Sequence, residues 1–335
     1  MLKIREWYIN FIEKGEKNIP ENAIYIFLLL LSFVYGAIVA FRNFLYTTGI
    51  FHTYKCAEKV ISIGNISWGG SGKTTLSFFL FQKLSPEYKV AVLRRGYGAD
   101  EGKIFEEKNI QVFSSPNRIE LTKRLASKFD LFILDDGFQY RKLRRDINIL
   151  IMGARELKMK TRLIPAGIFR EQFSALKRAD ILIINHKEEL DNIDEIINGL
   201  KSKFKHLSVY AASYKFKEIR DLKNNLIDIG LLKGKKLAAL AGIGYPGGFF
   251  NKLKRLGIEV SKKITYPDHY DLTGTEFISL QESLIKENMQ GVLITGKDKY
   301  HLPKADLKID FYVMEIEIEI AEEKKLLNDI TTRLG

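Results

Sequence analysis

The pattern of hydrophobic and polar residues begins with one long apolar segment. Residues 23–41 (AIYIFLLLLSFVYGAIVAF) contain no charged side chain, and an apolar segment of this length predicts a helix that could cross a bilayer. A cleaved signal peptide is disfavoured because the apolar core is too long and no clear cleavage site follows it. A buried core helix would be unusually apolar. We therefore favour a membrane helix, and the sequence leaves open whether it spans the membrane or lies in it.

Beyond residue 44 the pattern changes to short apolar runs that alternate with stretches of helical spacing. Runs rich in Val, Ile and Leu are typical of strands that are buried on both faces. We predict strands at residues 60–63, 89–93, 110–113, 130–134, 147–152, 179–185, 209–216, 237–243, 258–266, 291–294 and 311–320. The alternation predicts an α/β fold with mainly parallel sheets, in which a P-loop NTPase-like domain is followed by a smaller α/β domain.

The length of 335 residues favours more than one domain. We divide the chain into a membrane-associated region at residues 1–44, a phosphate-loop domain at 45–187 and a C-terminal α/β domain at 188–335. The single cysteine, Cys56, excludes a disulfide within the chain.

The strongest functional signal is KVISIGNISWGGSGKTTLSFFL at residues 59–80. An apolar β-branched run enters a glycine-rich turn, which ends at Lys73 and Thr74 and opens a helical run. Glycines let backbone N–H groups curl around an anion, and a helix N-terminus attracts the same charge. The spacing is irregular, because the strict phosphate-loop pattern has glycine where Ser67 stands. The residues expected to bind nucleotide are Gly69, Gly70, Ser71, Gly72, Lys73, Thr74 and Thr75.

A second signal follows the apolar run at residues 130–134, which leads directly into Asp135, Asp136 and Gly137. An acidic residue at the carboxyl end of a parallel strand, downstream of a phosphate loop, is where the Mg²⁺ of a nucleotide is held. A surface turn would also use Asp-Asp-Gly, so the motif gains its meaning from the loop before it. We predict Thr74, Asp135 and Asp136 as the metal-binding residues.

The net charge of +12 indicates an acidic partner. Nucleic acid is disfavoured because no zinc-finger spacing, RNP-like motif or dense basic helix is present. An anionic membrane surface or a phosphorylated substrate fits instead. The basic run RKLRR at residues 141–145 is either a solvated turn or a clamp for phosphate, and charge alone does not choose between them.

Several segments, in this order, make the chain resemble the tetraacyldisaccharide 4′-kinases of lipid A biosynthesis. They are GNISWGGSGKT (64–74), RRGY (94–97), LDDGFQYRKLRRD (134–146), IPAGIFRE (164–171), AGIGYPGGFF (241–250), PDHY (267–270) and TGKD (295–298). The resemblance implies a kinase at the cytoplasmic face of the inner membrane that uses ATP and Mg²⁺. It implies phosphorylation of the 4′-hydroxyl of an acylated disaccharide 1-phosphate, and we expect a monomer.

The resemblance also implies roles for individual residues. Lys73 would act in catalysis, and His269, from the second domain, would close over the substrate. The residues expected on the substrate side are Arg118, Gln139, Tyr140, Arg170 and Glu171.

The chain departs from the family in two places. It lacks the family's Gly-Asp-Glu-Pro motif, whose Asp acts as catalytic base, and Asp100 aligns best as its substitute. An ordinary acidic loop is the alternative at that position. Tyr140 stands where the family has histidine, and a tyrosine keeps a hydrogen-bonding tip but loses imidazole proton chemistry near pH 7.

Two other functions stay open from the sequence. One is a membrane-tethered switch ATPase of the ParA/MinD kind, which also combines a GG-x-GKT loop with a membrane helix. Against it, the signature lysine of that group would fall at Trp68. The other is a degenerate family member that binds nucleotide and transfers nothing.

Overall fold

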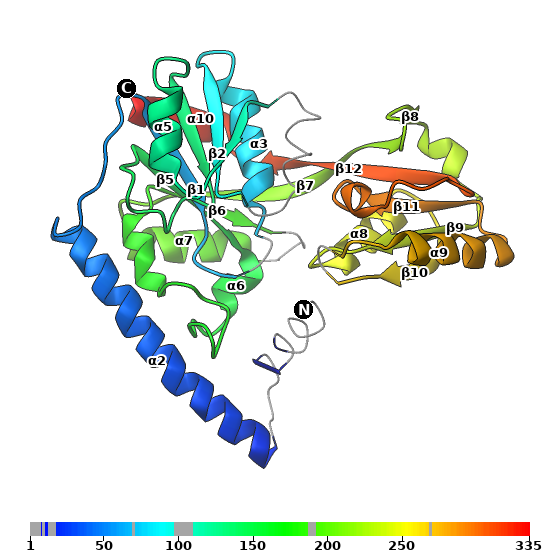
Figure 1. Ribbon diagram of the computed structural model, residues 1–335, viewed down its shortest axis with the longest axis horizontal. Coiled ribbons are helices and arrows are strands. Elements are labelled where there is room, and N and C mark those ends of the chain that lie inside the picture. The colour runs from blue at the N-terminus through cyan, green and yellow to red at the C-terminus, as the bar shows by residue number, and fades with distance from the viewer. Residues whose placement is uncertain are drawn as a thin grey trace. The chain divides into compact units, whose positions relative to one another are not determined.

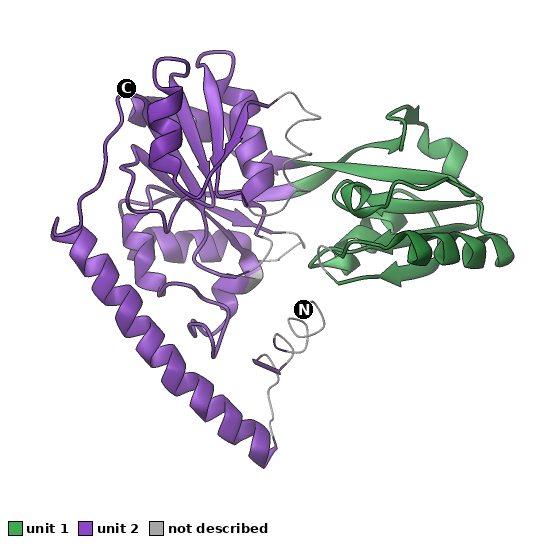
Figure 2. Ribbon diagram, in the orientation of Figure 1, with its two compact units in different colours: residues 1–6, 214–317 green, residues 7–213, 318–335 purple. Residues whose placement is uncertain are grey.

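The computed structural model describes Tyr8, Phe11, Ile12 and residues 18–68, 71–96, 110–186, 192–267 and 270–335. Contacts divide the chain into two compact units (Figure 2). The larger unit comprises Trp7–Ser213 and Ile318–Gly335, and the smaller one contains Tyr214–Glu317. The predicted α/β class is confirmed in both units.

The larger unit is built on a parallel sheet with strand order β7-β6-β5-β1-β4-β2-β3. Strand β1 lies between β4 and β5, which places the predicted phosphate loop at the middle of the sheet (Figure 1). The strands are β1 (Lys59–Gly64), β2 (Val90–Arg94), β3 (Val112–Ser114), β4 (Leu131–Asp135), β5 (Ile147–Gly153), β6 (Ile181–Asn185) and β7 (Ser208–Asp221).

The central strands are buried along their length because helices and loops cover the sheet. Strands β2, β4 and β6 are entirely buried, as their continuous apolar runs predict. The helical elements of this unit that follow β1 are α3 (Lys73–Leu84), α5 (Arg118–Leu125), α6 (Ala154–Lys158), η1 (Phe173–Arg178), α7 (Ile193–Lys203) and α10 (Glu323–Leu334). Leu121 and Leu125 of α5 pack on β2 and β4, while Leu200 of α7 packs in the cluster that includes β5 and β6.

The smaller unit holds a second parallel arrangement with strand order β10-β9-β11-β12. Helix α8 packs through Phe249 and Phe250 in one apolar cluster, and α9 packs through Phe277 and Leu284 in another. The elements are β8 (Leu226–Ile227), η2 (Ile229–Leu232), β9 (Leu237–Ala241), α8 (Pro246–Arg255), β10 (Val260–Thr265), α9 (Gly274–Lys286), β11 (Gly291–Thr295), η3 (Asp298–His301) and β12 (Phe311–Ile320).

Strands β7 and β12 each begin in one unit and end in the other. The segment at residues 209–216, expected as an extended linker strand, is part of β7, which pairs with β6 in parallel from Ser208 to Ala212. The contacts therefore place residues 192–213 with the phosphate loop. They also return the C-terminal helix α10 to the larger unit, so the expected boundary at residue 187 falls inside that unit.

Helix α2 (Ile19–Thr47) corresponds to the long apolar segment (Figure 1). Asn18 and Glu21 form a capping box and Pro20 occupies the first turn, which explains why the helix starts before the apolar residues do. Among the described residues it is the one helix long and apolar enough to cross a membrane, with a mean hydropathy of 2.5. Only Ser32 and Gly36 are buried within it.

Candidate active site

The phosphate loop connects the carboxyl end of β1 to the first residue of α3, Lys73. Two of its glycines are required by geometry. A Cβ on Gly64 would lie 2.5 Å from the Cβ of Phe138, and Gly72 caps α3 with a φ of +100°. Thr74 and Thr75 follow in the first turn of α3. Gly69 and Gly70, expected to bind nucleotide, lie outside the described residues.

Buried polar side chains hold the described part of the loop in place. Asn65 donates its Nδ2 hydrogen to Ser71 Oγ at 3.1 Å, and Asn185, the last residue of β6, donates to the Ser71 carbonyl at 2.8 Å. Ser67 donates to Glu156 Oε2 at 2.7 Å. Neither asparagine was predicted from the sequence as part of the site. A polar residue ending a buried apolar strand, as Asn185 does, is the signal that could have found one of them.

The segment IPAGIFRE forms a second support for the loop. The Trp68 N–H donates to the Ile168 carbonyl at 2.6 Å, and the Arg170 N–H donates to the Ile66 carbonyl at 2.7 Å. This pairing fixes Arg170 and Glu171 next to the phosphate loop, although 89 residues of sequence separate the two motifs. The motif order alone did not predict that contact.

Asp135 lies at the end of β4 with 5% of its surface exposed. Thr74 Oγ1 is 3.4 Å from its Oδ2, Ser77 Oγ is 3.3 Å from its Oδ1, and Arg94 Nε is 3.7 Å from Oδ2. The Thr74 hydroxyl at the start of α3 and the Asp135 carboxylate at the end of β4 are hard oxygen ligands. They fit Mg²⁺, which takes few protein ligands and completes its shell with water and phosphate oxygens.

Asp136 has different neighbours, although it is the next residue. Its φ of +52° turns the chain away from the strand. Its carboxylate lies 3.7 Å from Lys73 Nζ and 3.4 Å from Arg170 Nη1. Burial alone would raise the pKa of Asp136, but the charges of Lys73, Arg170 and Arg118 outweigh it and hold the pKa below its ordinary value.

Arg118 and Tyr140 form a stacked pair beside these carboxylates. The Arg118 guanidinium lies 5.0 Å from the centre of the Tyr140 ring and donates to the Asp136 carbonyl at 3.1 Å. Arg118 is 2% exposed. Burial lowers its pKa, and this effect outweighs the charges of Asp136 and Asp135, which would raise the pKa. The Tyr140 ring thus supplies a face for a buried cation.

Gln139 and Glu171, expected on the substrate side, lie behind the loop. Gln139 Nε2 donates to the Asn65 carbonyl at 2.8 Å and to Glu171 Oε1 at 3.2 Å. Glu171 is 2% exposed, and its other oxygen accepts from Asn43 of helix α2. The two side chains therefore join the helix to the loop.

Asp100 and His269, expected to act in catalysis, lie outside the described residues. The smaller unit does show how the neighbourhood of the PDHY motif is held. Buried Asp298 accepts from Thr295 Oγ1 at 2.6 Å and from the Gly242 N–H at 2.8 Å, and burial raises its pKa. His301 Nδ1 lies 2.7 Å from Asp271 Oδ1. These contacts join the segments that follow β9, β10 and β11, whose carboxyl ends meet at one edge of the sheet.

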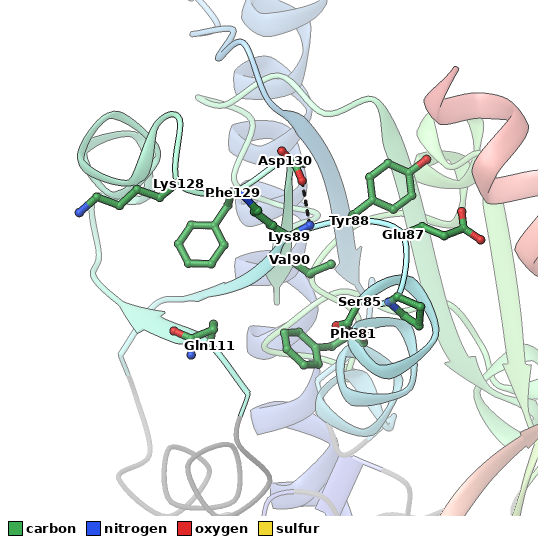
Figure 3. A pocket seen from close by; sticks show the side chains of 11 residues that line it. Phe81, Ser85, Glu87, Tyr88, Lys89, Val90, Gln111, Lys128, Phe129 and Asp130 are labelled. Atoms are coloured by element: carbon green, nitrogen blue, oxygen red, sulfur yellow. Dashed lines mark hydrogen bonds between the residues drawn. The ribbon is translucent and has the colours of Figure 1, made fainter.

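A hollow at the amino-terminal ends of strands in the larger unit is separate from this site (Figure 3). It lies where β2 and β4 begin, whereas ligands of parallel sheets bind at the carboxyl ends of the strands. The Lys89 N–H donates there to Asp130 Oδ2 at 2.9 Å. The lining residues are Phe81, Ser85, Pro86, Glu87, Tyr88, Lys89, Val90, Gln111, Lys128, Phe129 and Asp130.

A central parallel strand, a glycine-rich loop, a helix opening with Lys-Thr and an acidic residue on the neighbouring strand define a P-loop nucleotide-binding protein. Within that class the chain belongs to the tetraacyldisaccharide-1-P 4′-kinase family, LpxK, whose family model matches residues 24–109 and 100–335. The predicted family is thus confirmed, and membership supports the kinase function over the switch ATPase.

Curated relatives match the chain almost from end to end. A tetraacyldisaccharide 4′-kinase from Halothermothrix orenii is 29% identical over 95% of this chain and 95% of its own. One from Aquifex aeolicus is 33% identical over 89% of this chain and 96% of its own. A crystal structure of LpxK from Aquifex aeolicus in complex with ATP superposes with a TM-score of 0.72 and 28% identity, covering 93% of this chain and all of that one.

Proposed function

We propose that the protein transfers the γ-phosphoryl group of ATP to the 4′-hydroxyl of a tetraacyldisaccharide 1-phosphate. The observation that carries this proposal is the placement of Lys73 and Thr74 beside Asp135 and Asp136 in a chain of this family. Phosphoryl transfer needs positioning and neutralisation of charge more than covalent chemistry, and these residues provide both. The Aquifex relative crystallised with ATP supports the choice of nucleotide.

The contacts of each residue suggest its role in the reaction. Lys73 and the backbone N–H groups of Ser71 and Gly72 bind the β- and γ-phosphates at the start of α3. Thr74 and Asp135 would hold Mg²⁺, which would supply positive charge against the phosphates. Asp136 keeps Lys73 and Arg170 in place as their counter-ion.

The acceptor side depends on the two residues that the resemblance assigns. Asp100 takes the proton of the attacking 4′-hydroxyl, together with His269. Replacement of Asp100 by alanine is expected to lower kcat at least about a hundredfold, the usual contribution of a general base, with ATP affinity unchanged. Unchanged turnover of Asp100→Ala would place the base elsewhere.

Helix α2 lies along the membrane surface in this proposal and does not cross the bilayer. Its contacts with the larger unit run from Tyr25, which donates to the Ala166 carbonyl, to Asn43. The segment from Tyr25 to Asn43 is about 27 Å long at about 1.5 Å per residue. A crossing helix would carry Arg170 and Glu171 into a hydrocarbon layer about 30 Å thick, where charged groups are expensive.

The opposite face of α2 is apolar and exposed along its length, so it faces lipid. Single fluorophores placed at Ile26, Phe33 and Phe41, which are 58%, 79% and 64% exposed, test the orientation in vesicles containing depth-dependent quenchers. A helix lying in the interface gives one shallow depth at all three positions. A depth that passes through the bilayer centre between Ile26 and Phe41 would contradict it.

The reaction itself is tested with the purified full chain, Mg-ATP and tetraacyldisaccharide 1-phosphate in detergent. The product is weighed by mass spectrometry, and a gain of one phosphate is expected. ATP affinity is measured on the same preparation. Binding of ATP without any phosphorylated lipid would establish a degenerate member of the family and overturn the proposal.

A further inference from the structure

Glu171 stands at the junction of helix α2 and the phosphate loop. Its carboxylate is buried, and both oxygens accept hydrogen bonds from neighbouring side chains. Oε2 accepts from Asn43 Nδ2 at 2.8 Å and from Arg178 Nη2, and Oε1 accepts from Gln139 Nε2 at 3.2 Å. A buried carboxylate depends on all its donors, because each lost hydrogen bond leaves charge without compensation in a region of low dielectric constant.

From Glu171 the hydrogen bonds continue to the phosphate loop. Gln139 Nε2 also donates to the Asn65 carbonyl at 2.8 Å, directly after β1. Asn65 in turn donates to Ser71 Oγ, two residues before Lys73. Side chains thus connect Asn43, near the end of helix α2, to the turn that opens α3.

A second connection starts about two turns of α2 earlier and uses the backbone. Tyr35 donates its hydroxyl hydrogen to the Arg170 carbonyl at 2.9 Å. The Arg170 N–H donates to the Ile66 carbonyl, and the Arg170 side chain pairs with Asp136, the counter-ion of Lys73. Both connections leave the same side of the helix, and both end at residues that flank the phosphates in the proposed function.

We propose that Tyr35 and Asn43 of helix α2 are positioning residues for the phosphate loop, so that the seating of this helix sets the affinity for nucleotide. A helix that serves only as an anchor needs its apolar face and nothing else. That face points the other way, with Ile38, Phe41 and Phe44 each more than half exposed. The polar contacts of Tyr35 and Asn43 add nothing to membrane binding, and they end next to the loop.

The assignment rests on the proposed use of ATP, and Asn43→Asp tests it in the full chain. This change places a second carboxylate against Glu171 at nearly constant volume. We expect the Kd for ATP and the KM for ATP to rise about tenfold, as the loss of one buried charge-assisted hydrogen bond predicts. The KM for the lipid is expected to stay unchanged. Kd is measured by fluorescent-nucleotide titration, which requires no turnover.

Two further variants separate positioning from general damage. Asn43→Asp combined with Glu171→Gln exchanges the amide and the carboxylate, and is expected to recover part of the lost ATP affinity relative to either single change. Phe44→Ser, on the exposed face one residue away, is expected to weaken vesicle binding and leave the Kd for ATP within twofold. The affinities are read in detergent, where anchoring plays no part.

An unchanged Kd and KM for ATP in Asn43→Asp would overturn the inference and leave α2 as an anchor. A loss of affinity that the double variant does not recover would also overturn it, because the effect would then not pass through Glu171. Failure of the kinase function gives a different result. In that case the parent binds ATP and forms no phosphorylated lipid, while the comparison of affinities still decides the role of Asn43.

Discussion

Helices α2 and α3 are both rich in apolar residues, but α3 buries them against the protein and α2 exposes them. In α3 the buried positions include Leu76, Phe79 and Leu80, which pack toward the sheet. In α2 the buried positions are Ser32 and Gly36, and Phe33 between them is 79% exposed. The apolar residues of a helix therefore do not show by themselves which side faces the protein, and in α2 the small and polar residues mark that side.

The inverted arrangement of α2 has a clear physical cause. The larger unit offers it backbone carbonyls, and polar side chains on one stripe of the helix bind them: Ser32 donates to the Leu163 carbonyl at 2.9 Å and Tyr35 to that of Arg170. The apolar stripe is left on the outside, which is unfavourable in water and favourable against lipid. The following predictions test this contrast between the two helices.

The largest effect is expected at the first residue of α3. Lys73→Ala removes the side chain that we propose binds phosphate and that pairs with Asp136. Loss of a group that stabilises transition-state charge lowers kcat by about 10²–10³-fold or more. Lys83→Ala, at the other end of the same helix and 41% exposed, is the matched control and is expected to keep full turnover. Equal losses of kcat in both variants would mean that turnover depends on the helix as a whole and not on the side chain at its N-terminus.

The apolar residues of the two helices should respond differently to the same substitution. Phe79→Ser, at a position 7% exposed, is expected to lower the free energy of unfolding by about 3–5 kcal/mol, because it opens a cavity and buries a hydroxyl. Phe33→Ser is expected to change it by less than about 0.5 kcal/mol and to weaken vesicle binding. Urea unfolding in detergent and vesicle sedimentation measure the two quantities. A large loss of stability in Phe33→Ser would show that its face is covered by protein.

Much of this organisation follows from the sequence, because local rules govern it. The strand, loop and helix around Lys73 were predicted from apolar runs and glycines, and buried strands such as β4 from continuous aliphatic residues. The roles of Asn65 and Asn185 were not predicted, since a buried amide has no sequence pattern of its own. The place of Glu171 depends on Asn43, which lies more than a hundred residues away in the chain, so only the fold could join them.

The close approach of α2 to the larger unit gives a third prediction. A Cβ on Gly36 would lie 2.9 Å from Leu163 Cδ1, so Gly36→Leu forces the helix outward. Overpacking of this kind costs about 1–3 kcal/mol, and it should expose α2 to proteolysis and weaken ATP binding through Tyr35. Ala37→Leu, one residue further and exposed, is the control. Retention of the parent's protease resistance and ATP affinity by Gly36→Leu would argue against close seating.

The smallest change in stability is expected at Asp136, which is linked to both helices through its neighbours. Its carboxylate faces Lys73 of α3 and the side chain of Arg170. Tyr35 of α2 donates a hydrogen bond to the Arg170 backbone carbonyl. Because these cations hold the pKa of Asp136 below its ordinary value of 3.8, the ionised carboxylate stabilises the folded state above that pH. The stabilisation is lost as the pH falls through the lowered native pKa.

Asp136→Asn removes that contribution at neutral pH only. The difference in unfolding free energy between the parent and Asp136→Asn should be constant from pH 7 to about 5 and vanish in stronger acid. It should stay below about 1 kcal/mol, since water screens a carboxylate that is more than a third exposed. Urea unfolding across this pH range measures it. A parent that is less stable than Asp136→Asn at neutral pH, with the gap closing in acid, would mean that Asp136 is destabilising when charged and that the neighbouring cations do not compensate its burial.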